Sequence, residues 1–316
     1  MSTAAAASPV LDTRRPFTRA DALAAGISPA QIRGSRFRRI FRGVYIDAAV
    51  PESCTIRTTA ALLIHPPEAF ASHFSSAQVR GLPVPEHANV HITVWEAGHR
   101  VYRLGITCHA SQFPVEREDV TVVDRMRVSA PCRMFVELAS VLSLVDLVVV
   151  GDAMVRLKMC TREELVAYCG RCPAHHAADA RRAASYVRDG VDSPMETRVR
   201  MLIVLAGLPE PKVNFKVYDR NGVLVYRFDL SYPDLGLIVE YDGRQHADDT
   251  AQWNHDLERR EWIDDERLRI IVVTSRGVYR EPARTIERVR RALSDRGHHV
   301  PVWALSQEWR RFFPAS

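Results

Sequence analysis

Short apolar runs alternate with helix signals over residues 193–295, in the order helix, three strands, helix, strand, helix. Helices are expected at 193–206, 249–266 and 282–295, where apolar residues recur at helical spacing. Strands are expected at 213–218, 223–230, 237–242 and 268–274, and an Asn221-Gly222 hairpin signal joins the first two. This order predicts a small mixed sheet flanked by helices.

Carboxylates interrupt two of these expected strands, where apolar residues are the rule. Asp229 falls on the second strand, and Glu240 and Asp242 share one face of the third, because successive side chains of a strand alternate between faces. If the two strands are neighbours, these three carboxylates converge. Mg²⁺ prefers such oxygen ligands, and hydrolases of phosphodiesters use them to polarise the phosphate and activate water. Glu196, in the first helix, would add a fourth ligand.

Each of these acids also has a structural interpretation. Glu196 follows the expected N-cap of its helix by three residues, which is the spacing of a capping box. Asp242 precedes a glycine at the end of its strand and is also interpreted as a turn residue. Asp229 and Glu240 are costly in an apolar strand unless they are paired, and a salt bridge to Arg227 or Arg244 would satisfy them.

Two motifs carry these acids, Tyr226-Arg-Phe-Asp229 and Leu237-Ile-Val-Glu240-Tyr-Asp242-Gly243-Arg-Gln245-His246, and Asp256 and Arg260 follow. They resemble the Vsr-like (very-short-patch-repair-like) endonuclease domain of the PD-(D/E)XK nuclease superfamily. The resemblance implies a restriction-endonuclease-like αβββαβ core over 190–300 that uses Mg²⁺ or Mn²⁺. The residues to which it gives roles are the acids Asp229, Glu240 and Glu196, the carbonyl of Tyr241 as a further metal ligand, and Gln245 and His246 near the scissile phosphate.

One position departs from the superfamily pattern. A lysine normally stands two residues after the second acid, and this chain has Asp242 there, which cannot stabilise negative charge. Enzymes of the Vsr type also lack the lysine and use histidine, so the resemblance gives His246 an acid–base role, and Arg227 is a further cation on the Asp229 face. Two functions therefore stay open: a Mg²⁺-dependent DNA endonuclease, or a non-catalytic regulator or antitoxin-like DNA-binding protein.

Basic residues are concentrated in residues 13–43, which contain eight arginines and one acid, in a chain with a formal net charge of +5. Thr18 and Ser28 are expected to be the N-caps of two short helices separated by Gly26. Residues 36–46 then interleave arginine with apolar residues, which predicts a basic β-ribbon. The sum is a winged helix-turn-helix domain over 13–50.

In a winged helix-turn-helix the second helix enters the major groove and the wing follows phosphates, so an excess of arginine after the turn favours DNA as the partner. The alternative is a solvated basic face on a helical cap. The candidate DNA-contacting residues are Arg33, Arg36, Arg38, Arg39 and Arg42.

Residues 51–175 alternate helix and strand signals and predict an α/β connecting or protein-contact domain. Helices are expected at 55–63, 132–144 and 145–158, strands at 90–95 and 104–109, and an irregular Ser/His/Gly/Pro-rich stretch at 72–85. Four histidines are too dispersed along this sequence to indicate a metal site and are interpreted as packed or surface residues: His73, His91, His99 and His109. Cys169 and Cys172 have the spacing of zinc ligands, but the lack of a second such pair favours buried thiols.

The first half of the chain carries a second resemblance. Residues 17–46, followed by Ser72-His-Phe-Ser-Ser-Ala-Gln-Val-Arg-Gly-Leu82, resemble the winged-helix antitoxins of type IV abortive-infection toxin–antitoxin systems. This resemblance implies DNA binding, and it makes a toxin or a second copy of the chain a possible partner.

The remaining features concern location and class. We expect neither a signal peptide nor a membrane span, because the most apolar stretch, 136–150, contains two acids. Six scattered cysteines fit reduced thiols, so a cytoplasmic protein is expected. Taken together, the patterns predict a multidomain α/β (α+β) protein without a membrane partner.

Overall fold

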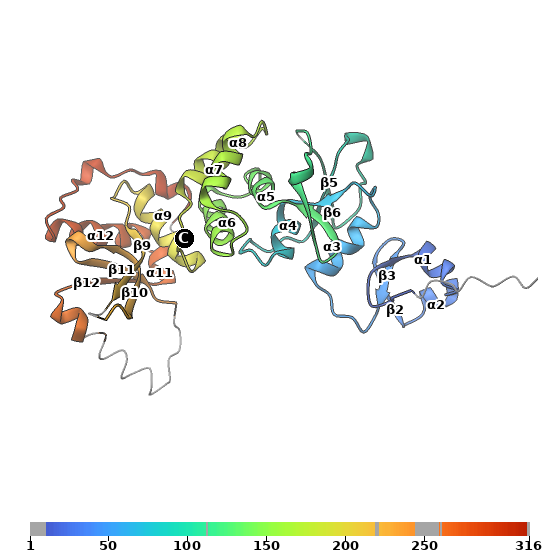
Figure 1. The fold of residues 1–316 in the computed structure, drawn as a ribbon, viewed down its shortest axis with the longest axis horizontal. Coiled ribbons are helices and arrows are strands. Elements are labelled where there is room, and N and C mark those ends of the chain that lie inside the picture. Colours follow the sequence, from blue (N-terminus) through green and yellow to red (C-terminus); the bar gives the residue numbers. More distant parts are fainter. Residues whose placement is uncertain (1–10, 112, 219–220, 244–258, 260, 315–316) are drawn as a thin grey trace, which may run out of the picture. The chain divides into compact units, whose positions relative to one another are not determined.

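The computed structural model describes residues 11–111, 113–218, 221–243, 259 and 261–314 (Figure 1). The chain forms two compact units, one of residues 1–141 and 168–178 and the other of residues 142–167 and 179–316. Helices and several sheets are both present, so the predicted mixed α/β class is confirmed. None of the helices in the described ranges combines the length and the apolar composition that a membrane span needs.

The first unit begins with two short helices and a three-stranded sheet of order β1-β3-β2. The elements are β1 (Phe17–Thr18), α1 (Arg19–Ala24), α2 (Pro29–Arg33), β2 (Phe37–Phe41) and β3 (Val44–Asp47). Both helices begin where their caps were predicted. The Thr18 hydroxyl accepts from the Asp21 N–H at 3.1 Å, and the Ser28 hydroxyl accepts from the Gln31 N–H at 3.3 Å. The third helical residue returns a hydrogen bond in each case, which completes two capping boxes.

A five-stranded sheet of order β6-β5-β4-β8-β7 follows in the same unit. Its strands are β4 (Phe70–Ala71), β5 (Val90–Val94), β6 (Ile106–Ala110), β7 (Val120–Val123) and β8 (Met126–Ser129). The helices are α3 (Cys54–Leu62), α4 (His73–Val79) and α5 (Pro131–Leu138), with 3₁₀ turns at Ala97–His99 and Arg117–Asp119. Strands β5 and β6 are parallel, and β4 is antiparallel to β5.

The expectation of an irregular stretch at 72–85 is wrong for its first half, where α4 forms. Serine and histidine have low helix propensity, but all residues from His73 to Ala77 are buried in this helix. Tertiary burial therefore overrides the local preference. On α3 and the sheet, apolar residues form a core that includes Ala60, Ile92 and Val128, and Phe41 and Val44 of the N-terminal ribbon belong to the same core.

The second unit contains a four-stranded sheet of order β12-β11-β10-β9, in which β11 and β12 are parallel and the other pairs are antiparallel. Its strands are β9 (Lys212–Tyr218), β10 (Leu224–Tyr232), β11 (Leu237–Tyr241) and β12 (Arg269–Val273). The helices from residue 144 onward are α6 (Leu144–Arg156), α7 (Arg162–Arg171), α8 (Ala177–Tyr186), α9 (Pro194–Leu205), α11 (Ser275–Tyr279) and α12 (Pro282–Asp295). Further 3₁₀ turns lie at Pro233–Leu235, Val302–Ala304 and Glu308–Arg311.

Helix α9 contacts strands β10 and β11, and helix α12 contacts strands β11 and β12 (Figure 1). The two helices also contact each other. The four strands and α9 and α12 lie close to their predicted positions, and α12 has the expected bounds 282–295. Most of the helix expected at 249–266 lies outside the described residues. Within this range, residues 261–265 are described and are helical. Short helix α11 was not anticipated.

A buried ion pair fixes α9 against α6. The Arg200 guanidinium donates to the Asp152 carboxylate at 2.9 Å, and both side chains are almost fully buried. The Thr197 hydroxyl donates to the same carboxylate at 2.8 Å. Because a buried charge must be paired and hydrogen-bonded, this network sets the position of the helix that carries Glu196.

Candidate functional site

Asp229 and Glu240 lie at the same end of the strand pair β10 and β11 in the second unit. The antiparallel pairing runs from Leu230 opposite Val239 to Tyr232 opposite Leu237, so each acid lies one residue beyond the paired positions. Both side chains are half-buried. The carboxylates of Asp229, Glu240 and Glu196 do not come within 4.8 Å of one another as a group. The structure therefore places the predicted acids in one region but does not gather them into a metal-binding cluster.

Asp229 also holds the backbone of the neighbouring strand. Its Oδ2 atom accepts a hydrogen bond from the Tyr241 N–H at 3.1 Å. Burial raises the pKa of Asp229, while this hydrogen bond and the charges of Arg259 and Arg227 lower it in part. The raised pKa means that the hydrogen bond and the nearby arginines do not fully offset the cost of burying the negative charge of Asp229. A bound cation would lower this cost.

Glu196 lies in the first turn of α9, close enough to Asp229 for their charges to interact. Burial raises the pKa of Glu196, and the negative charge of Asp229 adds to the rise. The Ser193 hydroxyl accepts from the Glu196 N–H at 3.2 Å, as in a helix cap. The Glu196 carboxylate accepts from the N–H of Asp192, one residue before the cap, at 3.0 Å. Ser193 is therefore the N-cap, but the predicted capping box does not form, because Glu196 binds the N–H of Asp192 and not that of Ser193.

The cations near the acids differ from the expected ones. Glu240 forms an ion pair with Arg259, whose guanidinium also lies 5.1 Å from the centre of the Phe228 ring. Arg227 was the expected partner of the strand acids, but it pairs with Asp192 at 2.8 Å. The sequence suggested Arg227 because it shares a face with Asp229, whereas the partner of Glu240 comes from the segment before β12. Arg244, the other candidate, lies outside the described residues.

The remaining predicted site residues are only partly described. Asp242 lies just beyond the end of β11, and its N–H donates to the Val273 carbonyl at 2.9 Å. Its backbone therefore continues the pairing with β12, and its side chain is half-buried. Tyr241, whose carbonyl was expected to bind metal, is the last residue of β11. Gln245 and His246 lie outside the described residues.

The candidate DNA-contacting arginines follow α2 and run along β2. Arg33 ends α2, Arg38 and Arg39 belong to β2, and the side chains of all five except Arg38 are exposed. Arg38 donates to the Val50 carbonyl at 2.9 Å and lies 3.7 Å from Glu52, so it also anchors the following segment. The Arg36 guanidinium lies 5.2 Å from the centre of the Phe37 ring.

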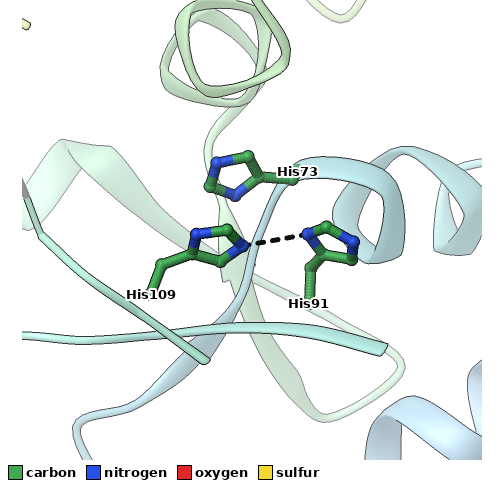
Figure 2. Close-up of side chains that lie close together, drawn as sticks. All are labelled: His73, His91 and His109. Atoms are coloured by element: carbon green, nitrogen blue, oxygen red, sulfur yellow. Dashed lines mark hydrogen bonds between the residues drawn. The ribbon is translucent and has the colours of Figure 1, made fainter. Parts of the chain in front are cut away.

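The structure brings together three histidines that sequence reasoning treated as dispersed. One ring nitrogen from each of His73, His91 and His109 lies within 4.8 Å of the others, and no further grouping of this kind occurs in the described part of the chain. His91 Nδ1 is 2.9 Å from His109 Nε2, and the His73 ring stacks on the His109 ring with 3.9 Å between centroids (Figure 2). These histidines are packed, as interpreted, but they are not dispersed in space.

Burial and mutual charge keep these three imidazoles neutral. Burial and the nearby His109 and His87 lower the pKa of His91 to about 3, and burial and Arg100 lower the pKa of His109 to about 4. The pKa of His73 also lies well below its usual value, chiefly through burial. All three rings are uncharged at pH 7.

A sequence signal for this cluster exists in the strand alternation. In β5 the apolar Val90, Ile92 and Val94 face the core, so His91 and Thr93 share the other face. The parallel register sets Thr93 opposite His109, which places His109 diagonally next to His91. A strand that is buried on both faces but polar on one of them indicates a functional surface.

Cys169 and Cys172 are both buried, as expected for packed thiols. None of the six cysteines, all of which lie in the described ranges, forms a disulfide.

Comparisons with known proteins provide relatives but no activity. No family model matches the chain. Two proteins of Mycobacterium tuberculosis, the uncharacterized proteins MT2308 and Rv2248, are each 26% identical to it over 166 residues. The match covers 52% of this chain and 61% of the length of each relative. The crystal structure of the RV2827C protein from the same species aligns with a TM-score of 0.40 and 13% identity, over 67% of this chain and 87% of that one, a likeness too slight to carry an argument.

Proposed function

We propose that this chain is a DNA-binding protein whose second unit carries a Mg²⁺-dependent endonuclease-like site that hydrolyses phosphodiester bonds in DNA. The observation that carries the proposal is the place of Asp229 and Glu240 at the same end of the β10–β11 pair, with Glu196 of α9 near enough to Asp229 for their charges to interact. The three carboxylates do not lie within 4.8 Å of one another, so a bound cation would have to draw them together.

The donor set fits a hard divalent cation. The carboxylates of Asp229, Glu240 and Glu196 and the carbonyl of Tyr241 are the oxygen ligands that would hold Mg²⁺ or Mn²⁺. Bound there, the ion would supply positive charge to polarise a phosphate. Asp229 positions the backbone of Tyr241 through its hydrogen bond, and Arg259 must share or release Glu240 when a cation binds.

The basic segment supports delivery of this site to DNA. Four exposed arginines lie on or beside α2 and β2, with a single acid among residues 13–43. Arginine side chains on a helix end and a ribbon bind phosphates, and phosphate contacts dominate the affinity of proteins for DNA.

A second candidate function is a non-catalytic DNA-binding regulator, in which the carboxylate site serves only the fold. Two observations favour it. Glu240 already has Arg259 as a partner, and Asp242 stands where the superfamily pattern has a cationic lysine. A regulator should bind the DNA upstream of its own gene far more tightly than random duplex, whereas a nuclease of low sequence preference should not.

The test is nicking of supercoiled plasmid and of a mismatched duplex by the full chain with Mg²⁺, Mn²⁺ or EDTA. Asp229→Asn keeps an oxygen that accepts from the Tyr241 N–H but removes the charge, so we expect it to lose at least about 100-fold in cleavage rate while it binds DNA normally. Asp234→Asn is the matched control, because Asp234 is an exposed aspartate in the turn between β10 and β11.

Equal cleavage by the Asp229→Asn variant and the unmodified chain would reject the nuclease assignment. Tight, salt-dependent DNA binding without metal-dependent cleavage of either substrate would favour the regulator instead.

A further inference from the structure

The cluster of His73, His91 and His109 lies in the first unit and has no part in the carboxylate site. The three residues come from the start of α4 and from the parallel strands β5 and β6 (Figure 2). His73 and His91 are buried, and His109 is half-buried on β6, which is an edge strand of its sheet. Three imidazoles from separate elements lie close together. Burial of an imidazole costs more free energy than burial of an apolar side chain at the same position.

We propose that His73, His91 and His109 form a binding site for a divalent transition metal, with Zn²⁺ as the best fit and a fourth position open to solvent or a small ligand. Three neutral imidazoles are borderline ligands that suit Zn²⁺, Co²⁺ or Ni²⁺ and not the oxygen-seeking Mg²⁺. This site is independent of the proposed nuclease function.

The spacing of the ring nitrogens is close to that of a three-histidine zinc site. With Zn–N bonds of 2.0–2.1 Å in a tetrahedral arrangement, two ligand nitrogens lie about 3.3 Å apart. His91 Nδ1 and His109 Nε2 are 2.9 Å apart, and all three candidate nitrogens lie within 4.8 Å of one another. The stacked His73 and His109 rings would have to part before the nitrogens of both could bond to one ion.

Hydrogen-bond partners outside the cluster hold two of the rings. His73 Nδ1 lies 3.0 Å from the Ser72 hydroxyl, which in turn accepts from the Thr93 hydroxyl at 2.7 Å. His91 Nε2 lies 3.2 Å from His87 Nδ1. A metal-bound histidine typically donates its other N–H to such a partner, so Nε2 of His73 and Nδ1 of His91 are the atoms directed to the metal.

The local backbone is arranged for the cluster at the expense of α4. Ser72 is the N-cap of this helix, but its side chain makes no capping hydrogen bond. Its hydroxyl forms hydrogen bonds with the His73 ring and the Thr93 hydroxyl instead. His73 itself has a φ of 46°, in the left-handed region that non-glycine residues avoid. Conformations of this kind persist where the surrounding structure needs them, which is typical of functional sites.

The charges around the cluster have both signs. Arg133 pairs with Asp119 at 3.1 Å and with Glu137 at 3.0 Å, and Glu137 also accepts the His73 N–H at 3.3 Å. In addition to burial, Arg133 lowers the pKa of His73 and Arg100 lowers that of His109, so both arginines disfavour positive charge at these rings. A bound cation must therefore gain its stability from the three ring nitrogens.

The open position has room for a ligand. A cavity of about 40 Å³ is lined by His73, His109, Ser111, Ser140 and His176, among others. One water needs about 10–15 Å³ of such space, so a metal-bound water or a small anion fits. Three protein ligands with an accessible fourth position are typical of zinc sites that do chemistry or exchange ligands, and not of closed structural sites.

The test uses the full chain, stripped of metal with EDTA, and Co²⁺ as a spectroscopic probe. We expect one equivalent of Co²⁺ to give the visible bands of tetrahedral nitrogen and oxygen coordination, and Zn²⁺ but not Mg²⁺ to displace it. His109→Gln, on an edge strand, should lower the Co²⁺ affinity at least about 100-fold, because it removes a ligand. His99→Gln is the matched control, since His99 is an exposed histidine of the same unit.

Absence of Co²⁺ binding, or binding unchanged by His109→Gln, would overturn the proposal. A strong near-ultraviolet thiolate band would overturn it as well, because the ligands would then be cysteines such as Cys169 and Cys172. Ring ¹⁵N resonances of the unmodified chain provide a measurement that does not depend on the folding of a variant. Three histidines should shift on addition of Zn²⁺, and a spectrum without such shifts would contradict the site.

Discussion

At the scale of single residues, the acids of the second unit divide by the partners that surround them. Asp229 is held by a backbone N–H, Glu240 by an arginine and Asp152 by a fully buried arginine. The first two are half-buried at one end of the β10–β11 pair. Asp152 lies where no water can replace its partner, so its role is in stability.

Loss of Asp152 should therefore be costly. Asp152→Ala leaves the Arg200 guanidinium buried with one carboxylate partner fewer, and we expect the free energy of unfolding to fall by about 3–5 kcal/mol. Asp146→Ala is the matched control, because Asp146 also joins α6 to an arginine of α9 but is 26% exposed. That change should cost about 1 kcal/mol or less. Urea denaturation of both variants measures the difference, and equal losses would contradict the argument.

At the scale of elements, strand and helix faces decide what the sheets can do. β10 and β11 carry one acid each just beyond their paired residues, and β5 and β6 set two histidines diagonally on a face that α4 covers. In the five-stranded sheet the alternation of side chains selects the residues that meet. The same alternation turns the histidines of β5 and β6 toward the interior, where burial lowers their pKa and keeps the rings neutral.

These buried histidines should make the metal-free protein sensitive to acid. Folding lowers the pKa of His91 to about 3 and that of His109 to about 4. In the unfolded chain both pKa values return to the usual value near 6.5. The unfolded chain therefore binds more protons below pH 6.5, so this contribution to stability is complete above pH 6.5 and is lost as the pH falls toward 4. His87 and Arg100, which face these rings, contribute to the same shifts.

Urea denaturation in EDTA at pH 7.5, 6 and 5 measures this loss. The decline should be shallower in His91→Gln, which has no imidazole to protonate at that position. A decline of the same steepness in both proteins would show that other groups cause it.

At the scale of the whole molecule, the N-terminal ribbon shares its core with the five-stranded sheet. Phe41 and Val44 belong to the same buried cluster as Ile92 and Ala60. The basic segment is therefore tied to the first unit by apolar burial. We expect the full chain to unfold in two calorimetric transitions, one for each compact unit, with no separate transition for residues 13–50.

Phe41→Ala tests this coupling. Removal of a buried phenyl ring costs about 3–5 kcal/mol, and the loss should lower the transition of the first unit alone. Leu104→Ala in the same unit is the control, because Leu104 is 99% exposed and should change neither transition. A third, independent transition that moves with Phe41→Ala would mean that the N-terminal segment folds by itself.

The sequence by itself determined the places of most elements of the second unit and the first two helix caps of the chain. The caps at Thr18 and Ser28, the bounds of α12 and the strands β9 to β12 follow from hydrogen bonds and periodicities that involve only a few adjacent residues. Such local signals do not depend on the rest of the fold. The assignment of nuclease, DNA-binding or antitoxin-like roles stays a prediction.

Only the tertiary structure decided which distant side chains meet. It formed α4 in a stretch with poor helix propensity, paired Glu240 with Arg259 and not with Arg227, and gathered His73, His91 and His109 from three elements. The physical reason is the same in each case. Burial and pairing across the chain depend on strand order, register and helix packing, and a few kcal/mol from such contacts overrides the smaller preferences of a single segment.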